Sequence, residues 1–184
     1  MLAAMHLRGD GGPKDTAEAR RLYGLAAAQG CKVAHTAIGY LHLRGQGGPV
    51  DYSEARRCFG LAADQGHAAA QTILGHMFLE GKGGPTDFAE ARRLLELAAA
   101  QGEAEAQVYL CLMHYEGHGG PRDFTEARRL VALAAAQDNA NAQLTLGEML
   151  KSGEGGPEDI VEARRLIELA AAQGHAGAGA DQPC

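Results

Sequence analysis

The sequence predicts an all-α protein, an α/α superhelical solenoid of about five helix–turn–helix repeats with a period of 36 residues. Gly-Gly-Pro occurs at 11–13, 47–49, 83–85, 119–121 and 155–157. Glu-Ala-Arg occurs at 18–20, 54–56, 90–92, 126–128 and 162–164. Alanine-rich segments occur at 26–30, 62–66, 98–102, 134–138 and 170–174. Three independent signals that keep one period along the chain identify a tandem array.

The first helix of each repeat is expected to bury one apolar face. In the unit that begins near residue 69, this helix is expected over 69–80. Its apolar residues have the i, i+3, i+4, i+7, i+8 spacing of a single helical face: Ala70, Ile73, Leu74, Met77 and Phe78. The Gly-rich segment 81–85 ends the helix, because glycine accepts left-handed conformations and proline cannot continue a helix.

The second helix is expected to begin after an aspartate. Asp87 is the predicted N-cap, and Glu90 completes an acidic form of the capping box. The other units repeat this pair as Asp15/Glu18, Asp51/Glu54, Asp123/Glu126 and Asp159/Glu162. The buried positions of the second helix are expected to be Phe88, Ala91, Leu94, Leu95 and Ala98. Gly102 ends it as a C′ glycine, and Asp138 takes that position in the fourth unit.

Residues 1–184 are interpreted as one repeat array, with unit boundaries near 33, 69, 105 and 141. Met1 aligns with Ala37 and Ile73, so the first unit is truncated, and the tail 176–184 lies outside the regular repeats. Neither end carries the polar cap that a repeat array needs for solubility. We therefore expect either that the natural protein continues beyond this segment or that the segment associates with itself end to end.

The type unit resembles a known repeat family. The resemblance rests on the pattern Ala70-x-x-x-Leu74-Gly75-x-x-Phe78-x-x-Gly81-x-Gly83, followed by Asp87, Glu90-Ala91 and Ala98-Ala99-x-x-Gly102. It is similar to the Sel-1-like repeat, a relative of the tetratricopeptide repeat, over essentially the whole chain. The resemblance implies an adaptor that assembles partners, with first helices on a concave side and second helices on a convex back.

This sequence also departs from the family pattern. Histidine replaces the aromatic of the Phe78 position at His6, His42 and His114, leucine replaces it at Leu150, and Cys111 replaces a packing glycine. A secreted bacterial branch of the family is linked to β-lactam binding, but its paired cysteine in every repeat is absent here. That activity is therefore not expected.

Charge and composition restrict the partners. The formal net charge of −6 argues against a nucleic-acid-binding module, which would carry a basic patch. The Arg-Arg pairs lie on helices that also carry glutamate, so they are interpreted as a solvated face of mixed sign. No apolar run approaches the roughly 20 residues of a membrane span, and membrane insertion is not expected.

The four cysteines, Cys31, Cys58, Cys111 and Cys184, have no CxxC pair or regular disulfide spacing. A reduced, cytoplasmic setting is favoured, although a secreted protein whose signal sequence was removed stays an alternative. Cys58 aligns with Leu94 and is expected to be a buried thiol, whereas Cys31 aligns with turn residues and is expected to be exposed.

No catalytic, metal or cofactor site is expected, and the chain is not interpreted as an enzyme. His6, His42 and His114 share one repeat position, but equivalent positions of stacked helices lie on the order of 10 Å apart, too far for one zinc ion. They are interpreted as packing residues. The segment from His114 to His118 has its glutamate in the wrong place for a metalloprotease helix, and the Gly-rich loops lack the Walker lysine.

The face of the first helices that is not used for packing is the predicted binding groove, because its residues vary between units whereas the scaffold positions hardly do. It comprises Leu7, Arg8, Thr36, Tyr40, Leu43, Arg44, Thr72, His76, Leu79, Glu80, Val108, Leu112, Tyr115, Glu116, Leu144, Glu148 and Lys151. Leucine and tyrosine beside charged residues suit a bound peptide or protein. Two alternatives stay open: a face that simply contacts water, and an accessory or regulatory segment of a larger enzyme or signalling protein without its own catalysis.

Overall fold

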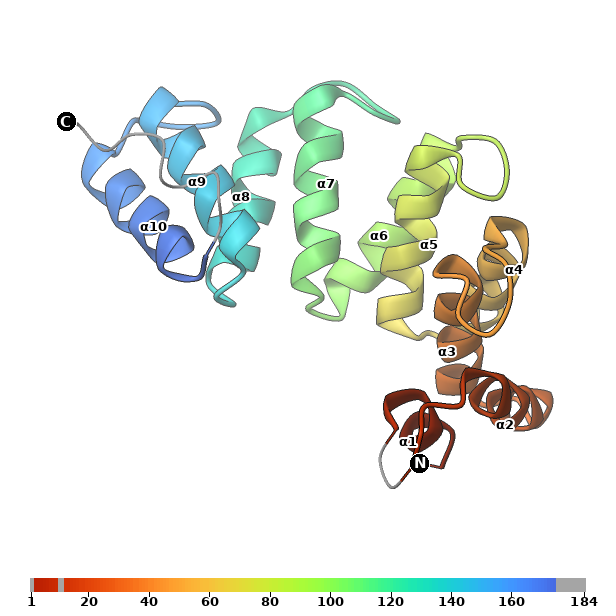
Figure 1. The fold of residues 1–184 in the computed structure, drawn as a ribbon. Helices are drawn as coiled ribbons and strands as arrows, with labels where there is room; N and C mark the ends of the chain where they lie inside the picture. Colours follow the sequence, from red (N-terminus) through yellow and green to blue (C-terminus); the bar gives the residue numbers. More distant parts are fainter. Residues whose placement is uncertain (1, 10–11, 175–184) are drawn as a thin grey trace. The chain divides into compact units, whose positions relative to one another are not determined.

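The computed structural model describes residues 2–9 and 12–174, and within these residues all regular secondary structure is helical (Figure 1). The helices are α1 (Leu2–Arg8), α2 (Thr16–Ala28), α3 (Lys32–Leu43), α4 (Tyr52–Ala63), α5 (Ala68–Glu80), α6 (Phe88–Ala100), α7 (Ala104–Glu116), α8 (Phe124–Ala135), α9 (Ala140–Ser152) and α10 (Ile160–Ala172). The tail 176–184 of the sequence-based interpretation lies outside the described residues.

The chain forms two compact units, residues 1–94 and 95–184, with the boundary inside α6. In the first unit α1, α2, α3, α4 and α5 pack each on the next. In the second unit α7, α8, α9 and α10 do the same. Within each unit the helices therefore form hairpins, and α2, α4 and α8 each contact the first helix of the following repeat.

The aspartate caps confirm the predicted starts of the second helices. The side chains of Asp15, Asp51, Asp87, Asp123 and Asp159 each accept a hydrogen bond of 2.9–3.0 Å from the backbone N–H of the glutamate three residues later. The reciprocal hydrogen bond that a capping box predicts, from the aspartate backbone N–H to the glutamate side chain, does not form. The N–H of Asp51, for example, donates to the carbonyl of His42 in the preceding helix at 3.0 Å.

The glutamates of these motifs bind arginine instead. Arg129 Nε and Nη2 donate to the two carboxylate oxygens of Glu126 at 2.8 and 2.7 Å, and the equivalent pair recurs in the other second helices. Hydrogen bonding to Arg129 lowers the pKa of Glu126. These residues are the second members of the Arg-Arg pairs, and they are exposed, as the sequence interpretation expected.

The turns also follow the sequence. Gly81 ends α5 in the left-handed region at φ +66°, and Gly102 follows α6 at φ +90°. Asp138 adopts φ +59° at the end of the fourth repeat, which confirms it as the substitute for the usual glycine. Of the residues expected to be buried in α6, Ala91, Leu94, Leu95 and Ala98 are buried. Phe88 is 36% exposed, so that expectation was wrong, because the first residue of the helix lies at its open end.

Small residues allow the two helices of a repeat to approach each other. A Cβ atom placed on Gly39 of α3 would lie 2.8–2.9 Å from three carbons of the Phe59 ring, which is fully buried. In α9 the same addition to Gly147 would meet Ile167 at 2.7 Å. The equivalent positions of the fourth repeat are the buried Cys111 and Val131, a larger residue combined with a smaller one.

We expect Gly39→Ala to destabilise the protein by about 1–2 kcal/mol, since the added methyl overpacks a filled core by more than the gain in helix propensity. Combined with Phe59→Val, its cost should be smaller than the sum of the two single changes, because valine leaves room for the methyl. Urea unfolding of the four proteins measures this coupling. Additive costs would contradict direct packing between the two positions.

In three of the Arg-Arg pairs, the first arginine connects one repeat to the next. Arg20 Nη1 donates to the carbonyl of Gly47 at 3.2 Å, and Arg56 Nη1 donates to that of Pro85 at 3.3 Å. In the second unit Arg128 donates to the carbonyls of Glu154 and Pro157 at 3.4 and 2.9 Å. The solvated face expected for both arginines is therefore wrong for these three, which are half-buried against the Gly-Gly-Pro loop of the following repeat.

These arginines also lie close to the second glycine of the Gly-Gly-Pro loop. A Cβ atom on Gly48 or Gly84 would collide with the Nη1 of Arg20 or Arg56, and one on Gly156 would lie 2.8 Å from the Nη1 of Arg128. The arginine of the preceding repeat therefore occupies the space that a side chain at this loop position would enter.

Replacing Arg128 with alanine should reduce the free energy of unfolding by about 1–3 kcal/mol, because two carbonyl groups lose a charged donor. The adjacent Arg129→Ala is the matched control and should cost less than ~1 kcal/mol, since an exposed ion pair contributes little. Chemical denaturation of both variants tests this difference. Equal losses would show that the two arginines do not have separate roles.

Candidate partner-binding face

Two residues of the predicted groove do not belong to an exposed surface. Thr36 and Thr72 are buried, with 6% and 2% exposure. Their hydroxyls donate to the backbone carbonyls one turn earlier in the same helix, of Lys32 at 3.0 Å and of Ala68 at 3.1 Å. The Thr36 hydroxyl also lies 3.4 Å from His67 Nδ1 at the start of the next repeat, so this helix position faces the repeat junction.

In the first unit the remaining residues surround an aromatic side chain. Tyr40 is half-buried, and its ring meets Phe59 edge to face with centroids 5.4 Å apart. The Arg44 guanidinium carbon lies 5.3 Å from the Tyr40 ring centroid, within cation–π range. Leu7, Leu43 and Leu79 are half-buried and Arg8 is exposed. The first-unit part of the face thus offers a rigid aromatic ring and arginine.

The acidic residue of this part, Glu80, has two nitrogen-bearing side chains beside it. Glu80 lies 2.5 Å from Lys82 Nζ and 3.4 Å from His76 Nε2. The hydrogen bond from Lys82 is the main reason that the pKa of Glu80 lies below its usual value. Sequence reasoning missed Lys82, because it lies in the turn after the helix rather than on the repeating helical face.

In the second unit the predicted face includes a tyrosine with two defined contacts. Tyr115 is 37% exposed, its ring meets Phe124 at 5.1 Å between centroids, and its hydroxyl donates to Glu154 Oε1 at 3.0 Å. Hydrogen bonding to Glu154 raises the pKa of the Tyr115 phenol. Glu154 belongs to the loop of the following repeat, outside the helical positions from which the groove was predicted.

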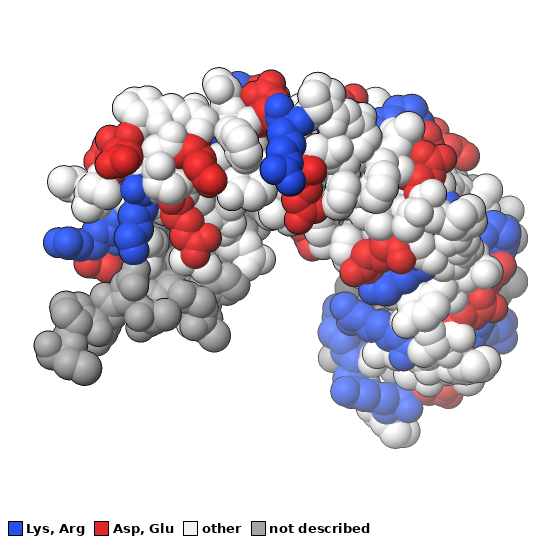
Figure 2. All heavy atoms as spheres, turned by 90° about the horizontal axis from the view of Figure 1, so that it is seen from above, with Lys and Arg blue, Asp and Glu red and all other residues white. Residues whose placement is uncertain are grey.

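The other predicted second-unit residues differ in exposure. Leu112 is 41% exposed, and Val108 and Leu144 are half-buried. Glu116, Glu148 and Lys151 are exposed, and Glu116 lies 3.0 Å from His118 Nδ1. On the molecular face seen in Figure 2, basic and acidic side chains adjoin one another. The local chemistry is an apolar and aromatic centre with charges of both signs beside it.

His42, one of the three histidines that share a repeat position, lies at the junction between two repeats. His42 is buried, with Arg20 Nη2 3.0 and 2.9 Å from its two ring nitrogens. At the same position of the next repeat, Phe78 has the Arg56 guanidinium carbon 3.7 Å from its ring centroid. Among the described residues no three histidine, cysteine or carboxylate side chains gather as metal ligands would. His42 is therefore a packing residue that contacts arginine, as phenylalanine does in the following repeat.

Burial lowers the pKa of His42, and Arg20 and Arg57 lower it further, against the opposing influence of Glu54 and Asp51. The unfolded chain therefore binds this proton more readily than the folded one. The stability that comes from neutral His42 is complete above the unfolded pKa of about 6.5 and is lost as the pH falls.

His42→Phe should remove that dependence while Arg20 stacks on the new ring, as Arg56 does on Phe78. Relative to the wild type, the variant should therefore become more stable as the pH is lowered from about 7.5 to 5. Thermal unfolding of both proteins across this range measures the difference. A difference in stability that does not change with pH would contradict the buried neutral histidine.

The cysteines lie as the sequence indicated. Cys31 is exposed and Cys58 is buried, and both are free thiols. Burial is the main cause that raises the pKa of Cys58, and it raises that of Cys111 to about 12. Both buried thiols therefore stay protonated near neutral pH. Cys184 lies outside the described residues.

None of the helices within residues 2–9 and 12–174 is both long enough and apolar enough to cross a membrane.

The helical hairpins, the arginine contacts and the Gly-Gly-Pro loops define a helical-repeat protein of the solenoid class. The sequence profile of the Sel1 repeat matches residues 1–31, 32–67, 68–103, 104–139 and 140–175. The chain belongs to the Sel1 repeat family. Proteins with these repeats are in general protein-interaction scaffolds, and the fold is typically non-catalytic. No curated protein matches the sequence.

Solved structures confirm the fold. A protective antigen of uropathogenic Escherichia coli strains with an SLR fold is 31% identical with a TM-score of 0.90, and the match covers 96% of this chain and 38% of the antigen. A Sel1 repeat protein from Oxalobacter formigenes is 27% identical with a TM-score of 0.92, covering 96% of this chain and 70% of that one. An immunity protein from Pseudomonas aeruginosa, 19% identical with a TM-score of 0.62 and coverage of 99% and 70%, shares the fold.

Proposed function

We propose that this protein is an adaptor that binds a peptide or protein segment on its first helices. The binding face consists of Leu7, Arg8, Tyr40, Leu43, Arg44, His76, Leu79 and Glu80 in the first unit, and of Val108, Leu112, Tyr115, Glu116, Leu144, Glu148 and Lys151 in the second. We name it the first-helix face. It retains the predicted groove residues apart from the buried Thr36 and Thr72.

One observation carries the proposal: residue variation between repeats coincides with exposure on the same helices. The position of Tyr40 is His76, Leu112 and Glu148 in later repeats, and all of these are half-buried or exposed. The neighbouring position, Leu41, becomes Met77, Met113 and Met149, which are at most 2% exposed. Constant buried positions beside variable exposed ones are the arrangement that a repeat scaffold with an adaptable binding surface uses.

The chemistry of the first-helix face suits an extended or helical peptide. Tyr40 and Tyr115 are held by edge-to-face contacts with Phe59 and Phe124, so little side-chain freedom is lost when a ligand covers them. Arg44 beside Tyr40 offers a charged contact at the edge of an aromatic surface. Rigid aromatic anchors with arginine are the residues that most often dominate binding energy at interfaces.

The second candidate is an accessory or regulatory segment of a larger protein. It is favoured by the lengths of the similar structures, since this chain spans 38% of the antigen and 70% of the Oxalobacter protein. Its partners would then be those of the larger assembly.

A reducing compartment such as the cytoplasm is consistent with the free thiols of Cys31, Cys58 and Cys111.

A library of random peptides displayed on phage, selected on the wild-type chain, tests the first-helix face. Peptides that bind should lose at least about tenfold in affinity for the double variant Arg44→Glu/Glu116→Arg, because the charges beside both tyrosines are reversed. The helical circular dichroism should be unchanged, since both residues are exposed.

The matched control is Glu54→Arg/Arg57→Glu, which reverses an exposed ion pair on a second helix and keeps the net charge. It should bind the same peptides with unchanged affinity. If the peptides bound the control variant more weakly than the wild type but bound the first-helix variant with unchanged affinity, binding would be assigned to the second helices. A bait that selects no peptide would contradict peptide recognition by this protein.

A further inference from the structure

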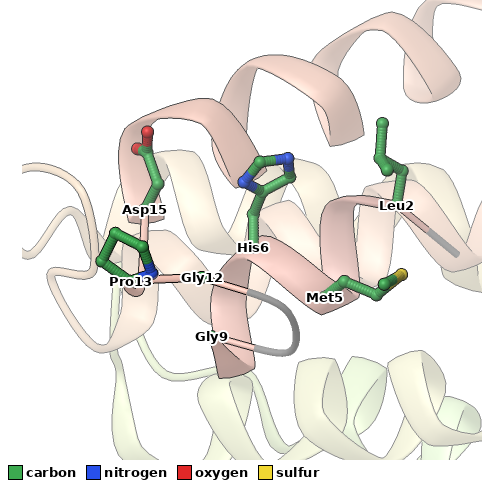
Figure 3. Close-up of a pocket in the computed structure, with 7 residues that line it drawn as sticks. All are labelled: Leu2, Met5, His6, Gly9, Gly12, Pro13 and Asp15. Carbon is green, nitrogen blue, oxygen red and sulfur yellow. The ribbon is translucent and has the colours of Figure 1, made fainter.

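The start of the array has a pocket of about 230 Å³, which we name the end pocket. Its lining comes from α1, the loop after it and the cap of α2: Leu2, Met5, His6, Gly9, Gly12, Pro13 and Asp15. The side chains of Leu2 and His6 project from the same side of α1 (Figure 3). These residues are the first-repeat equivalents of the surface that α2, α4 and α8 cover on the following repeats.

The equivalent positions inside the first unit are closed by the preceding repeat. His6 corresponds to His42 and Phe78, which contact Arg20 and Arg56 of the repeats before them. Leu2 is 59% exposed, whereas its counterpart Ile38 is half-buried and its counterpart Leu74 is 6% exposed. Met5 is half-buried, whereas Leu41 and Met77 are each 1% exposed.

The surroundings of the second glycine in Gly-Gly-Pro also differ between the first repeat and later repeats. At Gly48, Gly84 and Gly156 an added Cβ meets the guanidinium of the preceding repeat. At Gly12 an added Cβ has no heavy atom within 4 Å. The end pocket therefore lacks the arginine-bearing second helix that the same surface binds at each of these junctions.

The other end of the array presents such a helix. Arg164 of α10 is the counterpart of Arg20, Arg56 and Arg128, and it is exposed where those three are half-buried. It makes no hydrogen bond or ion pair with the described residues. Beside it, Ile160 and Val161 are 49% and 84% exposed, and the counterparts of Val161 are the small or polar Ala17, Ser53, Ala89 and Thr125.

We propose that the end pocket binds α10 of a second copy of this chain, with Arg164 donating to the Pro13 carbonyl and covering His6. The template is the junction inside the chain, where Arg56 and Arg128 donate to the equivalent carbonyls of Pro85 and Pro157. The contact is head to tail, so each copy uses two different surfaces, and further copies can add to the free ends. The proposal does not depend on the first-helix face.

Sedimentation equilibrium of the full chain over a wide concentration range tests the association. The average mass of the wild type should rise with concentration above that of the monomer. Arg164→Glu should weaken association by about thirtyfold or more, because the carbonyl and the His6 ring lose a cationic donor at the interface. The matched control is Arg165→Glu on the same helix turn, whose arginine binds Glu162 instead, and it should retain association.

Gly12→Lys blocks the other surface. Its side chain has open space in the free chain, so thermal stability should be unchanged, but in the complex it would occupy the place of Arg164 and repel it. The same change at Gly48 should destabilise the fold, because Arg20 already lies there.

Mixing the two blocked variants gives the decisive measurement. Arg164→Glu keeps its end pocket and Gly12→Lys keeps its α10, so each alone should stay monomeric, while their equimolar mixture should form a dimer and nothing larger. A wild-type mass that is independent of concentration overturns the proposal and assigns the pocket to another occupant, such as a preceding repeat of the same polypeptide. Association that survives both substitutions, or a mixture that stays monomeric, overturns it as well.

Discussion

The contact on which the stacking within each unit depends is made by one arginine of a second helix, in α2, α4 and α8. Arg20, Arg56 and Arg128 each donate to backbone carbonyls of the loop that connects the two helices of the following repeat. A loop of glycine and proline has few side chains with which to pack, so its exposed carbonyls need a donor from elsewhere. The arginine supplies a charged donor and also fixes the distance between consecutive hairpins within each unit.

That single contact constrains residues on both sides of it. A Cβ on the loop glycine opposite the guanidinium would displace the arginine, as Gly48 and Gly84 show. The first-helix residue beside the loop needs only a surface that an arginine can cover, and His42 and Phe78 both meet this requirement. This explains why the loop sequence hardly varies while the aromatic position accepts imidazole, phenyl and, at Leu150, an aliphatic side chain.

The division between the two helices of a repeat has a functional consequence. Second helices and loops hold neighbouring repeats together, so their residues are repeated with little change. First helices bury one side in the hairpin and leave Tyr40, Leu112 or Tyr115 partly exposed on the other. Variation is tolerated there because it disturbs no junction, and a Sel1 repeat protein can therefore change its ligand without changing its fold.

The sequence by itself determined the repeat, the aspartate caps, the glycine turns and the left-handed Asp138, because each of these depends on residues within a few positions of one another. The tertiary structure alone decided how two adjacent arginines differ. Successive residues of a helix point about 100° apart, so Arg129 meets Glu126 on its own helix while Arg128 reaches the next repeat. It also decided that Thr36 and Thr72 are buried and that Tyr115 binds Glu154, since contacts between distant residues follow from how the hairpins stack and not from local spacing.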